Sequence, residues 1–283
     1  MHRIQCAEIW GGIRNQEQDV CSAGIEASLY SSACDGGKGG DIYCLSVCES
    51  DMLTRIAIAD VVGYGGAVTD VSQFVFDALK SHMNDASGAS VLTEMNHITE
   101  GHGLKAMTTA AIIAFYRSDH NLYFAYADHH PALVKRQQDR NWFEAELEEP
   151  GDSGMTPHAN LPLAVMSETV FTQQHVPLTA GDLVFLYTDG VIEAPDGQRD
   201  IFGLDRLTAV LDAEGSAPMK QLRTSVLDEL NSHTGGDLSH DDVTLLAVGI
   251  RQQGRGIKHQ DGDGRPWIPS PSSRSLRHSS SSV

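Results

Sequence analysis

Four aspartates, spread along most of the chain, occur in the same kind of local setting. Each lies where an apolar, strand-like run meets a Gly-rich or polar turn. They are Asp41 in GGKGGDIYCLSV, Asp60 in RIAIADVVGYGG, Asp189 in LVFLYTDGVIEA and Asp241 in SHDDVTLLAVGI. A carboxylate at the end of a buried strand is costly to desolvate unless a cation or hydrogen-bond donors meet it. Four such carboxylates predict strands that converge on one acidic pocket, and a pocket of oxygen ligands suits Mg²⁺ or Mn²⁺ better than zinc.

Taken singly, each aspartate also has a plainer interpretation. Asp60 could cap the helix that follows it, although the apolar spacing starts that helix several residues later. Asp189 with its following glycine could form a simple turn. Asp241 and Asp242 together open the last predicted strand, and adjacent strand residues face opposite ways. We therefore expect only one of those two to point into a shared site.

The Gly-rich string GGKGGD at residues 36–41 invites comparison with a phosphate-binding loop. It lacks the GxxxxGK[ST] frame, and no clear helix follows it. The glycines are instead expected to allow a close backbone approach at a turn before Asp41 begins its strand. Lys38 is the only lysine or arginine within three residues of any of the four aspartates. It could contact an incoming phosphate, but a solvated loop lysine is the preferred interpretation.

Apolar periodicity predicts strands and helices that are interleaved unevenly. The polar turn at 118–121 predicts a hairpin, and the short strand after it is expected to continue the same meander. Strands in meanders and helices in pairs predict an α+β layered sandwich rather than alternating βαβ units. The predicted strands are 24–31, 42–48, 55–59, 107–116, 122–127, 132–135, 172–177, 182–187 and 243–249, and the predicted helices are 68–83, 90–100, 204–212 and 219–232.

Length and composition set the class of protein. The 283 residues, 41% of them hydrophobic, suffice for one substantial core or two small ones. No apolar stretch approaches the roughly 20 residues of a membrane span, and the N-terminus has no signal-peptide core. The 5 cysteines contain no CxxC pair. An odd count without a secretory signal predicts a cytoplasmic protein.

The charge is negative and unevenly distributed. The formal net charge is −18 from 20 Lys/Arg and 38 Asp/Glu, and residues 251–283 hold 6 and 2 of these, which leaves 14 − 36 = −22 for residues 1–250. Such a surface repels nucleic-acid phosphates and anionic membranes, so neither is an expected partner. Residues 251–283, rich in Ser, Arg, Gly and Pro, are predicted to be a disordered tail behind a domain at 1–250.

In order, the strings resemble the metal-dependent protein phosphatases, specifically the bacterial SpoIIE/RsbU-type branch of the PPM family. The chain gives GGDIY, ADVVGYG, ADHHPALV, LYTDGVIEA and DDVTLLAV in the order of that family's motifs, and the resemblance covers about residues 20–250. Each motif is weak alone, but the set is fairly specific. The resemblance implies a layered α-β-β-α sandwich, in which two central, mostly antiparallel sheets are flanked by helix pairs.

The resemblance also implies a binuclear Mn²⁺ or Mg²⁺ site, with roles carried over motif by motif. Asp60 would bridge both ions, and the Val61 carbonyl would be a backbone ligand. Asp189 and Asp241, rather than Asp242, would complete one ion's shell, and Asp41 would serve the other. Two ions about 3.5 to 4 Å apart could activate a shared water for in-line attack on phosphorus.

The sequence departs from the family pattern in two of these motifs. Tyr64 replaces a histidine that is often present in this branch, and Val62 stands where the animal-type branch has one, so the general acid is unassigned. The meander turn reads Ala-Asp-His-His-Pro, so Asp128 replaces a glycine. The adjacent His129 and His130 could bind metal or relay protons, but turn packing is the preferred interpretation.

The sequence thus predicts a cytoplasmic phosphoserine/phosphothreonine protein phosphatase in bacterial signalling. By resemblance alone, its substrate would be a phosphorylated anti-sigma-factor antagonist or similar STAS-domain protein. Residues 67–100 would form a regulatory switch or a dimer surface, although their helical spacing alone supports only a packed amphipathic pair. Control would come in trans or be absent. The alternatives are a non-catalytic regulator that keeps the fold, and a phosphohydrolase acting on small molecules.

Overall fold

The computed structural model describes residues 1–48, 51–63, 68–85, 87–148 and 159–251. The chain divides into two compact units, Met1–Gln252 and Gln253–Val283. The predicted tail therefore lies, after its first residue, outside the described residues. Within the described residues, no helix is long and apolar enough to cross a membrane.

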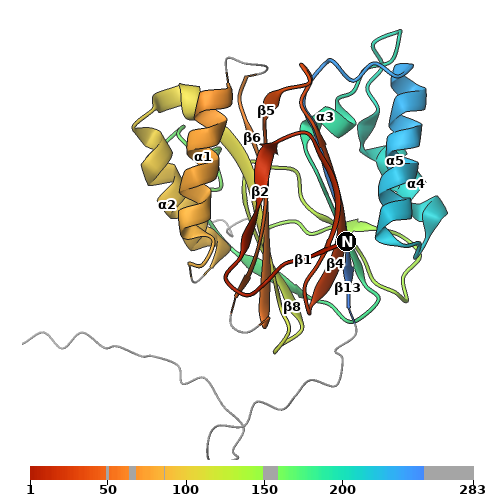
Figure 1. The fold of residues 1–283 in the computed structure, drawn as a ribbon, viewed down its shortest axis with the longest axis horizontal. Coiled ribbons are helices and arrows are strands. Elements are labelled where there is room, and N and C mark those ends of the chain that lie inside the picture. The colour runs from red at the N-terminus through yellow and green to blue at the C-terminus, as the bar shows by residue number, and fades with distance from the viewer. Residues whose placement is uncertain (49–50, 64–67, 86, 149–158, 252–283) are drawn as a thin grey trace, which may run out of the picture. The chain divides into compact units, whose positions relative to one another are not determined.

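Two stacked β-sheets form the centre of the first unit, with helices on both outer faces (Figure 1). Within the described residues, the paired strands are antiparallel except β1 (His2–Arg3) with β3 (Gln16–Cys21). The six-stranded sheet has the order β11 (Gln174–Pro177), β8 (Asn121–Ala127), β7 (Thr108–Tyr116), β6 (Leu53–Val61), β5 (Lys38–Cys48) and β2 (Ile9–Arg14). The seven-stranded sheet has the order β1 (His2–Arg3), β3 (Gln16–Cys21), β4 (Ile25–Ser32), β13 (Val243–Ile250), β12 (Leu183–Tyr187), β9 (Leu133–Lys135) and β10 (Phe143–Glu144).

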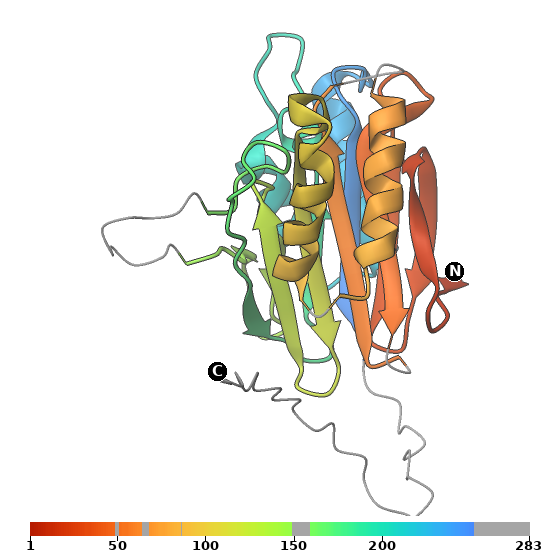
Figure 2. The same cartoon turned by 90° about the vertical axis from the view of Figure 1, so that its left-hand side faces the viewer.

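The helices cover the sheets in two groups. The helices α1 (Thr69–His82) and α2 (Gly88–Glu100) lie across the six-stranded sheet, as Figure 2 shows face on. The 3₁₀-helix η2 (Gly103–Ala106) follows α2. The short α3 (Asp189–Ile192), α4 (Gly203–Glu214) and α5 (Met219–Thr234) share an apolar cluster with the seven-stranded sheet. The predicted α-β-β-α sandwich is confirmed.

Strand alternation divides the apolar side chains into three clusters. Between the sheets pack residues such as Leu45, Ile58 and Leu246, while the neighbouring strand positions face the helices. Along β5 the odd-numbered residues from Tyr43 onward face the other sheet, and along β6 the even-numbered residues do so. This period of two places the two strand aspartates, Asp41 and Asp60, on the face between the sheets.

One sequence prediction about pairing is wrong. The strand β9 does not continue the β7–β8 meander but pairs with β12 and β10 in the other sheet. The two strands around LTAGD also belong to different sheets, because β11 pairs with β8 while β12 pairs with β13. Apolar periodicity identifies a strand but carries no information on its partner, which explains the error.

The strand β5 also begins earlier than predicted. It starts at Lys38, so Gly39 and Gly40 are strand residues and not a turn before Asp41. The N-terminal strands β1, β2 and β3 were not predicted. Of these, β2 pairs with β5 and brings Trp10 against Tyr43, with ring centroids 5.7 Å apart.

The packing between the sheets predicts a large cost for truncating Leu246, which is 2% exposed in the inter-sheet cluster. Leu246→Ala is expected to lower the free energy of unfolding by about 2–5 kcal/mol, because the tightly packed sheets cannot close the cavity fully. Urea denaturation measures this difference. The matched control is Leu104→Ala at a side chain that is 68% exposed, and an equal loss in both variants would contradict the assignment.

Candidate metal centre

Asp41 and Asp60 form a directly opposed cross-strand pair on neighbouring strands β5 and β6. Side chains in such a pair have Cβ atoms roughly 4.5–5.5 Å apart, and like charges there repel each other. Asp41 is 3% exposed. Burial and the negative charge of Asp60 raise the pKa of Asp41 well above its usual range, although hydrogen bonds from Thr244 and Thr188 oppose that shift.

The other sheet brings further carboxylates to the same end of the sandwich. Asp189 begins α3 after β12 ends, and Asp241 and Asp242 precede β13. Burial raises the pKa of Asp60 to about 8, and the negative charges of Asp189, Asp241 and Asp242 add to the shift. The structure therefore brings together all four aspartates that the sequence singled out, together with a fifth.

Asp242 holds the Gly-rich loop in place through its carboxylate. One oxygen accepts the Cys34 amide at 2.8 Å, and the other accepts the amides of Gly40 and, at 3.4 Å, Asp41. The strand begins only at Val243, so the alternation used to separate Asp241 from Asp242 does not apply, and both carboxylates lie close to Asp60. Asp242 uses both oxygens on backbone amides, while Asp241 accepts one amide and is only half-buried.

Three glycines permit the close approach of these segments. A Cβ on Gly40 would lie 2.6 Å from the Val61 carbonyl oxygen and 3.0 Å from Asp60 Oδ1. A Cβ on Gly39 would collide with the Asp242 carboxylate, and one on Gly190 with the Asp242 carbonyl oxygen. The glycines of the GGD and TDG strings are thus explained by steric contact between strands that are far apart in sequence.

Two residues to which the sequence analysis gave no role position the carboxylates. The Thr188 hydroxyl donates to Asp41 Oδ2 at 2.9 Å and accepts from the Thr244 amide at 3.0 Å, which ties together β5, β12 and β13. His240 Nε2 lies 2.9 Å from the Gly190 carbonyl oxygen and so connects the two aspartate-bearing turns. Each stands directly before a singled-out aspartate, Thr188 in YTDG and His240 in SHDD, and that adjacency was the available signal.

The structure also locates the basic and histidine candidates. Lys38 is exposed, with Nζ 3.4 Å from Gln73 Oε1. His129 packs into the turn after β8, where Nδ1 lies 3.0 Å from the His130 carbonyl oxygen, and burial lowers its pKa to about 4. His130 stacks on Tyr187 with centroids 5.6 Å apart. Val62 is 47% exposed, and Tyr64 lies outside the described residues.

The donor set matches a divalent cation in charge and chemistry. Asp41 Oδ1 and Asp189 Oδ1 are buried and have no hydrogen-bond partner, which is costly for carboxylate oxygens unless a cation meets them. The Val61 carbonyl lies at the same place, beside Gly40. In the described part of the chain, no three His, Cys, Asp or Glu side chains stand in a geometry that would hold an ion. The residues therefore fit a divalent ion by type and charge, without a closed coordination shell.

Comparison with known proteins identifies the family. The family model for Stage II sporulation protein E (SpoIIE) matches residues 50–251, which include three of the four aspartate motifs. The chain belongs to the SpoIIE family. This SpoIIE-family chain is 25% identical over 236 residues to protein IcfG of Synechocystis and 23% identical over 257 residues to phosphoserine phosphatase RsbU of Bacillus subtilis.

The relatives differ in how much of their length is matched. The alignments cover 78% of this chain but 33% of IcfG, and 83% of this chain and 72% of RsbU. The structure of the RsbU and RsbW domains of a Mycobacterium tuberculosis protein superposes with a TM-score of 0.69 at 22% identity, covering 84% of this chain and 63% of that one. The fold of this SpoIIE-family chain is therefore shared with an RsbU-containing protein.

Steric contact at Gly40 predicts a sharp effect of a single methyl group. Gly40→Ala is expected to displace the Val61 carbonyl and the Asp60 carboxylate, and so to weaken Mn²⁺ binding by about tenfold or more. Isothermal titration calorimetry measures the Mn²⁺ affinity of the variant and of the unmodified chain. Gly197→Ala is the control, because no atom lies within 4 Å of its added Cβ; equal Mn²⁺ affinities in the two variants would contradict the steric argument.

Repulsion among the carboxylates predicts that Asp60→Asn stabilises the protein in the presence of a chelator. The raised pKa of Asp60 means that ionisation costs folding free energy as pH rises from the unfolded value near 3.8 towards about 8. We expect a gain of about 1–3 kcal/mol at pH 8 and little gain at pH 4, measured by urea denaturation with EDTA. Asp212→Asn, at an exposed site on α4, is the control; a destabilised Asp60→Asn at pH 8 would refute the prediction.

Proposed function

We propose that this chain is a metal-dependent serine/threonine protein phosphatase. The observation that supports it most is the convergence of Asp41, Asp60, Asp189 and Asp241 from both sheets, with orphaned buried oxygens, in a chain of the SpoIIE family. The relative RsbU carries the name phosphoserine phosphatase. Phosphomonoester hydrolysis needs positive charge near the phosphoryl oxygens and an activated water, and a carboxylate-held cation site can supply both.

In this proposal two Mn²⁺ or Mg²⁺ ions are held by Asp41, Asp60, the Val61 carbonyl, Asp189 and Asp241. Bound ions would lower the pKa of a water nucleophile and neutralise charge on the phosphoryl group. Asp60, central among the carboxylates that raise its pKa, is the proposed bridge. Thr188 orients Asp41, and Asp242 fixes the loop before it. Lys38 is a weaker proposal as a phosphate contact, because its ammonium would have to leave Gln73.

The substrate class and partners rest on family resemblance. We propose a phosphoprotein substrate, possessing a STAS domain of the anti-sigma-factor-antagonist type, in bacterial signalling. We also propose that α1 and α2, within residues 67–100, receive a regulator or a second copy of the chain, since they form the outer layer over the sheet that carries Asp41 and Asp60. A cytoplasmic setting is proposed from the cysteine content.

Asp189→Ala tests the catalytic proposal. Hydrolysis of p-nitrophenyl phosphate and of a phosphoserine peptide is expected only with Mn²⁺ or Mg²⁺. The kcat/KM of the variant is expected to fall at least about a hundredfold, because the substitution removes a proposed metal ligand whose buried Oδ1 has no hydrogen-bond partner. Asp212→Ala is the matched exposed control.

The outcomes of this experiment separate three functions. Activity without metal, or an unaffected Asp189→Ala, would sink the mechanism. Calorimetric Mn²⁺ binding without turnover of either substrate would favour the non-catalytic regulator. Turnover of p-nitrophenyl phosphate and small phosphate esters, but not of phosphopeptides or a phosphorylated STAS domain, would favour the small-molecule phosphohydrolase.

A further inference from the structure

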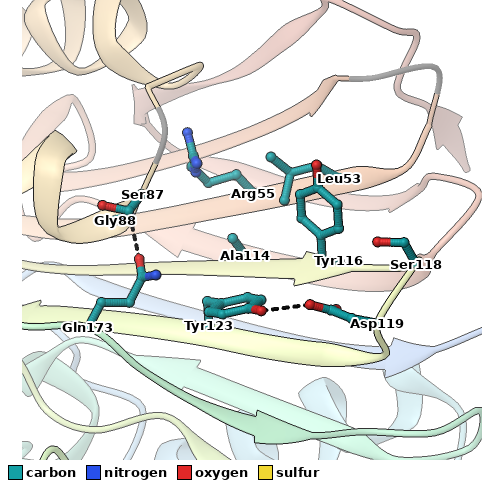
Figure 3. Close-up of a pocket in the computed structure, with 10 residues that line it drawn as sticks. All are labelled: Leu53, Arg55, Ser87, Gly88, Ala114, Tyr116, Ser118, Asp119, Tyr123 and Gln173. Atoms are coloured by element: carbon teal, nitrogen blue, oxygen red, sulfur yellow. Dashed lines mark hydrogen bonds between the residues drawn. The ribbon is translucent and has the colours of Figure 1, made fainter. Parts of the chain in front are cut away.

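A second site lies at the other end of the six-stranded sheet from the aspartates. A pocket of about 260 Å³ opens on the sheet face that carries α1 and α2, close to the turn that joins them (Figure 3). Arg55 lies five residues before Asp60 on β6, or about 17 Å along the strand. The pocket is lined by Leu53, Arg55, Ser87, Gly88, Ala114, Tyr116, Ser118, Asp119, Tyr123 and Gln173.

Arg55 is a buried cation that makes no ion pair with a described carboxylate, although the negative charge of Asp85 acts on it from farther away. The Arg55 side chain is 1% exposed, and its two terminal nitrogens donate to the carbonyl oxygens of Met83 and, at 2.8 Å, Asp85. Its Nε has no partner. Among the described residues, no carboxylate oxygen pairs with the guanidinium within 4 Å, and the Asp85 carboxylate instead lies 2.9 Å from His82 Nδ1.

Neutral carbonyls do not cancel the charge of a guanidinium. Burial disfavours the charged form and lowers the pKa of Arg55, yet a guanidinium stays protonated in proteins. An uncompensated buried charge is costly unless an anion pairs with it. Because Arg55 lines an open pocket, that anion can be supplied by a ligand.

The remaining walls indicate which anion fits. Ala114 lies on β7 directly opposite Tyr123 on β8, and Tyr116 follows two residues later along β7 (Figure 3). These residues offer apolar area to an organic group, and the Asp119 carboxylate, which accepts the Tyr123 hydroxyl at 2.6 Å, adds negative charge at one edge. That charge opposes a dianion such as phosphate and tolerates a singly charged one.

We infer that this pocket binds a small organic acid, whose single carboxylate pairs with Arg55 and whose apolar body packs on Ala114, Tyr116 and Tyr123. The volume is just below the range of drug-sized pockets, which suits a molecule the size of an amino acid or an aromatic acid. The site also joins α1 to α2, because Arg55 holds the carbonyls after α1 and Gln173 Oε1 accepts the Gly88 amide at 2.6 Å.

Benzoate is the probe, with benzamide as its neutral analogue and inorganic phosphate as the competing anion. Two-dimensional NMR titration of the full chain is expected to show saturable benzoate binding, at least about tenfold tighter than benzamide, because the guanidinium bond is charge-assisted. Ala114→Leu places a larger apolar side chain directly opposite Arg55 in the pocket, removes no hydrogen-bond donor or acceptor, and is expected to abolish binding. Tyr123→Phe keeps the ring and is expected to retain affinity within about twofold.

Arg55→Gln removes the proposed anion-binding group itself. This variant is expected to lose benzoate binding, so that its affinity for benzoate falls to its affinity for benzamide. Arg55→Gln also loses the hydrogen bonds to the Met83 and Asp85 carbonyls, so its affinity is interpreted only if its NMR spectrum is that of a folded protein. If Arg55→Gln unfolds, the affinity of Ala114→Leu for benzoate decides whether the site exists. Benzoate affinity unchanged in Ala114→Leu would overturn the site. Equal affinity for benzamide in the unmodified chain, or phosphate binding in place of benzoate, would overturn the carboxylate assignment.

Discussion

The repulsion between Asp41 and Asp60 is the constraint on which the rest of the structure depends. Register places them directly opposite each other on β5 and β6, and strand alternation turns both between the sheets. A sheet would normally avoid like charges in this position. The surrounding elements add carboxylates from the second sheet, so the fold concentrates negative charge that either protonation of a carboxylate or a bound cation must offset.

Because this end of the sandwich is electrostatically unfavourable, its backbone must be fixed by other contacts. Asp242 accepts amides from the loop before β5, and Thr188 ties the ends of three strands together. Glycines at 39, 40 and 190 allow these segments to approach more closely than any side chain permits. The apolar clusters on either side of both sheets supply the stability that holds the carboxylates in place.

The sequence predicted the elements and the acidic residues better than their connections. Asp41, Asp60, Asp189 and Asp241 were recognisable because each breaks an apolar run, a local signal. The sheet to which β9 belongs, the opposition of Asp41 to Asp60, and the role of Asp242 depend on pairing between distant segments. Local periodicity carries no such information. The sequence analysis expected only one of Asp241 and Asp242 in the site, because adjacent strand residues face opposite ways. That rule holds only inside a strand, and Asp242 lies one residue before β13 begins.

The distal pocket presents the opposite electrostatic situation on the same strand. At one end of β6, carboxylates lie together; near the other end, Arg55 is buried, and no carboxylate of the described residues forms an ion pair with it. Neither charge can compensate the other, because about 17 Å of strand separates them and the intervening side chains on either face are apolar. The helix α1 packs on the neighbouring strands β5 and β2, and Arg55 binds the carbonyls that follow this helix. A ligand at Arg55 would therefore act on the element that covers β5, the strand carrying Asp41, and any coupling between the two sites would pass through the packing of α1 rather than through direct electrostatics.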